Sequence, residues 1–187
     1  MMHPRLPAAI VLCLCGAFAT ACVNAPETSG TTIKQTFDAG LKAYDSGDFA
    51  GAYKDWSTIT DADLGAMRNV AVMLRTGKGV DKDPKAAQAM MRRAAEAGLF
   101  TAQADLGDML LKGEAGPPDP KAALPWLIAA AQQDHPLAQF ELGQLYEQGT
   151  VVDKNIEEAR RLYKAAAADG VKEAADRLAA MPPEIRP

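Results

Sequence analysis

The sequence is short of the residues that build most catalytic and metal sites. It has two histidines in 187 residues, and its three cysteines, Cys13, Cys15 and Cys22, all lie near the amino terminus. No cysteine cluster, H-E-x-x-H motif or G-x-S-x-G motif occurs. These absences exclude a disulfide-stapled scaffold and the common zinc and serine hydrolase sites. The sequence therefore predicts no cofactor, no metal and no catalytic residue.

An excess of positive charge is also missing. Lys and Arg number 20 against 24 Asp and Glu, and the two signs are interspersed, so no basic patch is available to follow a phosphate backbone. We expect no nucleic-acid partner and no small-molecule substrate. Acidic pairs such as Asp61 with Asp63, or Asp45 with Asp48, could suggest glycoside hydrolysis. We interpret Asp48 as a helix cap and the other three as solvated loop residues.

The first residues differ in composition from the rest of the chain. Arg5 precedes the apolar run LPAAIVLCLCGAFAT, and small residues follow, which predicts an export signal over residues 1–21. Ala19-Thr20-Ala21-Cys22 resembles the bacterial lipobox, which implies that Cys22 is lipidated and anchors the protein at the periplasmic side of a membrane. Ala19 departs from the usual leucine, so cleavage by an ordinary signal peptidase, giving a soluble periplasmic or secreted protein, stays an alternative. Residues 22–34 are polar and predict a flexible tether.

A repeat of 36 residues fills most of the remaining chain. AMRNVAVMLRTG (66–77), AQADLGDMLLKG (102–113), AQFELGQLYEQG (138–149) and the truncated AADRLAAM (174–181) align without a gap. A second segment in each unit carries apolar or small residues at i, i+3, i+4 and i+7, as an amphipathic helix does. Each unit is predicted to be a helical hairpin. Because one hairpin cannot bury its own apolar stripe, stacking predicts an all-α solenoid.

Capping residues place the helices within this repeat. Asp83, Asp119 and Asn155 suit the starts of second helices. The predicted ends are Gly77, Gly113 and Gly149 for the first helices and Gly98, Asp134 and Gly170 for the second. The solenoid of residues 35–181 then comprises a first hairpin (35–64), three repeats (65–98, 99–134 and 135–170) and a capping helix (171–181), before a proline-rich tail (182–187). Pro125 should bend its helix, unless the helix begins only at Pro125.

Small residues at one shared position predict close helix crossings, and larger residues fill the space between them. The small ones are Ala71, Gly107 and Gly143. The filling residues are Leu106, Leu142, Leu162, Met90 and Trp126, and Trp56 is a further core candidate.

These residues resemble the Sel-one-like repeat family, relatives of tetratricopeptide repeats. The likeness rests on the alanine, the following Leu-Gly pair, the closing glycine and the second helix with paired alanines. Gly77-Lys78-Gly79-Val80 keeps the family's usual loop, whereas residues 114–118 and 150–152 depart from it. Some members carry cysteine pairs and were linked to β-lactams, but this chain lacks those cysteines. The resemblance implies a right-handed, curved α-solenoid whose first helices line a concave face.

That face is the predicted binding surface for a protein or peptide partner, and the protein is interpreted as a non-catalytic scaffold or adaptor at the bacterial cell envelope. By the repeat register the groove residues are Arg68, Val72, Arg75, Ala104, Asp108, Leu111, Phe140, Gln144 and Glu147. Phe140 is either an exposed anchor for a peptide or a side chain packed on the next hairpin. His135 is expected to be an exposed turn residue. A cell-wall or β-lactam hydrolase, and a soluble effector that binds a host factor, stay alternatives.

Overall fold

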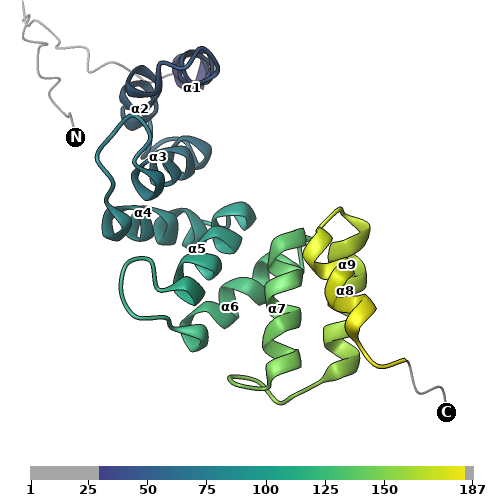
Figure 1. Ribbon diagram of the computed structural model, residues 1–187. Helices are drawn as coiled ribbons and strands as arrows, with labels where there is room; N and C mark the ends of the chain where they lie inside the picture. Colours follow the sequence, from purple (N-terminus) through teal and green to yellow (C-terminus); the bar gives the residue numbers. More distant parts are fainter. Residues whose placement is uncertain (1–29, 184–187) are drawn as a thin grey trace, which may run out of the picture.

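Nine helices follow one another in the part of the chain that the computed structural model describes, residues 30–183 (Figure 1). They are α1 (Gly30–Asp45), α2 (Phe49–Ser57), α3 (Leu64–Thr76), α4 (Pro84–Glu96), α5 (Phe100–Lys112), α6 (Pro120–Ala131), α7 (Pro136–Gln148), α8 (Ile156–Ala168) and α9 (Lys172–Ala180). Helices in extensive contact are neighbours along the chain, and α5 also packs against α7. The predicted all-α solenoid of stacked hairpins is therefore confirmed. None of these helices combines the length and apolar character that crossing a membrane requires.

The predicted helix starts are confirmed by side chains that accept a hydrogen bond from the first turn. Asp83 accepts from Ala86 N at 3.0 Å and Asp119 from Ala122 N at 2.9 Å. Asp48 and Asn155 cap α2 and α8 in the same way. The interpretation of Asp63 as a solvated loop residue is wrong, because its carboxylate accepts from Ala66 N at 2.7 Å and caps α3.

The predicted helix ends are confirmed as well. Gly77, Gly113 and Gly149 close α3, α5 and α7 in the left-handed conformation, which glycine adopts without a steric penalty. Asp134 has a φ of 56° where the other units have Gly98 and Gly170. Aspartate tolerates this conformation better than most residues with a Cβ, so the turn keeps its geometry without glycine.

Close crossings lie where the small residues predicted them. A Cβ added to Gly143 would lie 2.7 Å from Cε1 of Tyr163, and one on Gly107 would collide with the side chain of Leu127. Leu106, Leu142 and Leu162 are buried between these crossings, and Trp56 is buried in the first hairpin. Met90 and Trp126 were predicted to fill the core as well, but both are only partly buried at its edge.

Helix α6 settles one of the two alternatives for Pro125. The helix runs without interruption from Pro120 to Ala131 and includes Pro125, so the alternative start at Pro125 is wrong. Pro125 is exposed on this helix. The bend itself stays a prediction.

The amino-terminal boundary of the solenoid differs from the expectation. Helix α1 begins at Gly30, so residues 30–34, predicted as the end of the tether, form its start. Ile33 packs against the core, and Lys34 pairs with Asp38 one turn later, which together favour helix over tether. The predicted export signal (1–21), Cys22 and the rest of the tether up to residue 29 lie outside the described residues.

Candidate binding groove

The first helices of the three repeats, α3, α5 and α7, carry all nine predicted groove residues, but the structure divides these residues between separate hollows. A cleft of about 450 Å³ over α5 and α7 collects five of them: Arg75, Ala104, Asp108, Phe140 and Gln144. Arg68 and Val72 line a second hollow of about 360 Å³ between α1 and α3. Leu111 and Glu147 are not among the residues that line these two hollows.

Arginines on α3 reach across to the neighbouring helix. Arg68 Nε lies 2.6 Å from Asp105 Oδ2 on α5. Arg75 donates to Glu114 Oε2 at 2.7 Å and also pairs with Asp108. Hydrogen bonding to Glu114 is the main reason that the pKa of Arg75 lies above its ordinary value. The two predicted groove arginines therefore join consecutive repeats, and only part of each side chain faces the surface.

A pair of carboxyl groups lies in the cleft. Asp108 on α5 and Glu141 on α7 both line the cleft, and their carboxyl groups interact. Burial and the neighbouring Asp108 raise the pKa of Glu141 to about 8. Burial would also raise the pKa of Asp108, but hydrogen bonds from Lys112 and Arg75 outweigh it and lower that pKa. Glu141 is therefore mostly protonated near neutral pH, in the form that can donate a hydrogen bond to a carboxylate such as Asp108.

His135 also belongs to the cleft, so its interpretation as an exposed turn residue is wrong. Its ring is partly buried against Phe100, with 6.1 Å between the ring centroids. Its Nδ1 accepts a hydrogen bond from Ala138 N at 3.4 Å and caps α7. Burial lowers its pKa below the ordinary histidine value, so the ring is neutral at pH 7.

Phe140 combines features of both interpretations given for it. Its ring packs against Tyr163 of α8, with 5.7 Å between centroids, and the side chain is partly buried. It also lines the cleft beside Leu137, whose side chain is 56% exposed. Glu147 is held away from the cleft, since it accepts from the Tyr163 hydroxyl at 2.7 Å and lies 3.6 Å from Arg177. Burial raises the pKa of Tyr163, so this hydroxyl keeps its proton.

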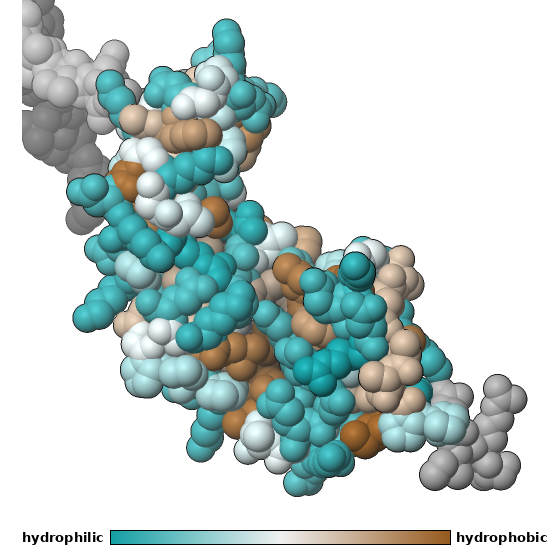
Figure 2. Space-filling model, in the orientation of Figure 1, coloured by the Kyte–Doolittle hydropathy of each residue, from teal (hydrophilic) through white to brown (hydrophobic). Residues whose placement is uncertain are grey.

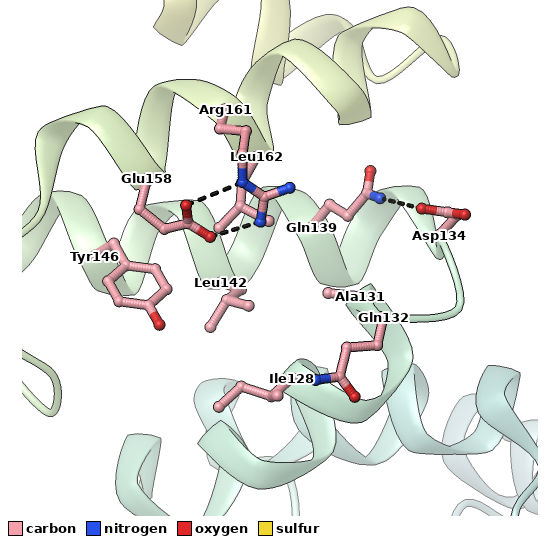
Figure 3. A pocket seen from close by; sticks show the side chains of 10 residues that line it. All are labelled: Ile128, Ala131, Gln132, Asp134, Gln139, Leu142, Tyr146, Glu158, Arg161 and Leu162. Atoms are coloured by element: carbon pink, nitrogen blue, oxygen red, sulfur yellow. Dashed lines mark hydrogen bonds and ion pairs between the residues drawn. The ribbon is translucent and has the colours of Figure 1, made fainter.

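A further hollow of about 370 Å³ lies between α6, α7 and α8, a place that the sequence did not single out (Figure 3). Ile128 and Leu142 give it apolar walls. Its polar side chains bond to each other: Gln139 donates to Asp134 at 3.2 Å, and Arg161 pairs with Glu158. Figure 2 shows that hydrophilic side chains cover most of the face in view, while apolar surface gathers over α6. The cleft over α5 and α7 is the better candidate site, because it brings five of the predicted groove residues together beside Leu137, whose side chain is more exposed than Leu41 of the hollow between α1 and α3.

Solved structures of helical repeat proteins resemble this chain. A Sel1 repeat protein from Oxalobacter formigenes is 32% identical with a TM-score of 0.68, and the match covers 76% of this chain and 58% of that one. The c5321 protein, a protective antigen present in uropathogenic Escherichia coli strains, is 29% identical with a TM-score of 0.73 over 79% of this chain. The chain spans only 33% of the c5321 protein. Helicobacter pylori cysteine rich protein B, at 18% identity and a TM-score of 0.54, shares the fold.

The repeats identify the family to which the chain belongs. No curated protein matches the chain. The sequence model of the Sel1 repeat matches residues 64–99, 101–135 and 136–171, which correspond to the hairpins α3–α4, α5–α6 and α7–α8. These three matches cover more than half of the 187 residues. The chain belongs to the Sel1 repeat family.

Proposed function

We propose that this protein is a non-catalytic scaffold that binds a protein partner in the cleft over α5 and α7, at the bacterial cell envelope. Sel1 repeat solenoids generally serve as scaffolds for protein interactions, and their stacked helices offer an extended surface. The observation that carries the proposal is the cleft itself, in which the exposed Leu137 and the partly buried Phe140 lie beside charged side chains. An apolar anchor point with a polar rim is typical of protein interfaces.

The envelope location is supported by the sequence alone. The predicted signal over 1–21 directs export, and lipidation of Cys22 would hold the solenoid close to a membrane. Replacing Cys22 tests the anchor. Cys22→Ala should move the protein from the membrane fraction to the soluble fraction of cells, whereas an unchanged distribution would contradict lipid anchoring.

Site-specific photo-crosslinking in cells tests the groove. A photoreactive amino acid at position 144, which lines the cleft, should give a crosslinked product. The same group at position 89, which is exposed on α4, is the matched control and should give none. Products at position 89 without products at position 144 would place the partner on another face.

A further inference from the structure

A comparison of equivalent positions in successive repeats shows that the cleft lacks a basic side chain that the preceding interface has. At the interface of α3 and α5, Arg68 pairs with Asp105 at 2.6 Å. One repeat later, at the interface of α5 and α7, the equivalent residues are Ala104 and Glu141. The acidic member of the pair is kept, and the basic member is replaced by a methyl group.

The interface of α5 and α7 also lacks an equivalent of Arg75. Arg75 pairs with Asp108, whereas the corresponding residues one repeat later are Leu111 and Gln144. Among residues 30–183 no basic side chain forms an ion pair with Glu141, and the two cations of the cleft, Arg75 and Lys112, pair with Asp108. The cleft opens beside Ala104, at the position from which Arg68 reaches its acid one repeat earlier.

The charges of the cleft agree with a cationic occupant. Its lining contains the carboxyl groups of Asp105, Asp108, Glu141 and Glu173 against two cationic groups, those of Arg75 and Lys112. Both of these cations already pair with Asp108. Arg68, from outside the lining, pairs with Asp105, so one negative charge stays uncompensated when every carboxyl is ionised. Leu137 and Phe140 supply apolar surface at the same cleft.

We propose that this cleft binds a basic side chain of a partner peptide, whose cation pairs with Glu141 as Arg68 pairs with Asp105, and that an apolar neighbour in the peptide contacts Leu137 and Phe140. The inference rests on the proposed function and adds the chemistry of the partner. Desolvated ion pairs of this kind give specificity, because a peptide with a neutral or acidic residue at this position would leave the Glu141 carboxylate without a partner.

Binding of a cation should also take the proton from Glu141. With a pKa of about 8, the Glu141 carboxyl is mostly protonated at pH 7 when no cation is bound. The charged groups that face it are Asp108 and Lys112 on α5 and Arg75 on α3. Pairing with a cation requires the ionised form, so peptide affinity should rise about tenfold from pH 7 to pH 9. His135 is neutral over this range and adds no opposing trend.

Fluorescence anisotropy with short labelled peptides tests the inference. The probe is Gly-Leu-Arg-Leu-Gly-Gly, and the matched probe has glutamate in place of arginine. The arginine peptide should bind at least about tenfold more tightly, since a tenfold change corresponds to the worth of one modest charged contact. Glu141→Gln should weaken its binding about tenfold and remove the pH dependence, whereas Glu96→Gln, at an exposed acid that ends α4, should change neither.

Ala104→Arg gives the sharpest variant. It restores the missing arginine, so the new guanidinium should occupy the cleft and abolish peptide binding, with the helical circular dichroism spectrum and the melting temperature retained. Equal affinity for the two peptides, no binding of the arginine peptide at about 1 mM, or normal binding by a folded Ala104→Arg protein would overturn the inference. Crosslinks at position 144 together with any of these results would refute the basic occupant alone, whereas the absence of such crosslinks would count against the proposed function.

Discussion

The stability of the protein should fall as pH rises from about 5 to 9, and Glu141→Gln should remove most of that fall. The pKa of Glu141 is 4.5, the ordinary value, in the unfolded chain and about 8 in the folded protein. Between these values the folded state binds more protons than the unfolded state, so the free energy of unfolding decreases with increasing pH. The stabilising effect of protonated Glu141 is fully present below pH 4.5 and is lost as pH passes through about 8.

The size of the effect follows from the difference between the two pKa values. At about 1.36 kcal/mol for each pKa unit, the rise from 4.5 to about 8 corresponds to an upper limit of about 5 kcal/mol. Glutamine keeps a donor for the Asp108 carboxylate and cannot ionise. Glu141→Gln should therefore resemble the original protein at pH 5 and be more stable by several kcal/mol at pH 9.

Urea unfolding followed by circular dichroism at pH 5, 7 and 9 measures this difference. Glu96→Gln is the control, because Glu96 is exposed at the end of α4 and should give a parallel pH profile to the original protein. If the free energies of unfolding of Glu141→Gln and the original protein differ by the same amount at all three pH values, Glu141 is ionised in the folded state. The account of the carboxyl pair would then be wrong.

Three further substitutions test the packing of the solenoid by thermal or urea unfolding. Leu142→Ala removes a side chain that is 5% exposed in the core and should cost about 2 to 5 kcal/mol, so an unchanged melting temperature would refute the assigned register. Gly143→Ala places a methyl group against the ring of Tyr163 and should cost about 1 to 3 kcal/mol, unless the two helices separate freely. Asp119→Ala removes the cap of α6 and should cost about 1 kcal/mol, whereas Asp81→Ala, at an exposed loop position, should cost much less.

Most of the fold could be predicted because its rules are local or repeated. The caps Asp83 and Asp119 act within one helical turn, and the glycines that close the first helices need only their own backbone conformation. The spacing of 36 residues then fixed the helix faces. The start of α1 was missed because TTIKQ is polar by composition, and its helix depends on contacts such as the packing of Ile33 against the core.

The site was harder to predict, since helix register shows which face a residue occupies and not which neighbour its side chain reaches. Arg68 and Arg75 lie on the predicted face, yet their long side chains extend to acids on α5. His135 was assigned to solvent because its turn is polar, but Phe100 covers its ring. Glu141 was overlooked, although a comparison of charges at equivalent positions of the repeats would have pointed to it.

A repeat protein can build a binding site at low cost where polar residues differ between repeats. The apolar residues of each hairpin must be kept, because every interface in the stack depends on them. The pair of Arg68 and Asp105 is partly exposed, with side-chain exposures of 32% and 20%, and such pairs contribute only about 0 to 1 kcal/mol. Loss of the arginine at the next interface therefore costs the stack little in stability. It leaves a carboxyl group and a cleft for a partner's cation, while Leu106, Leu142 and the glycine crossings hold α5 and α7 in place.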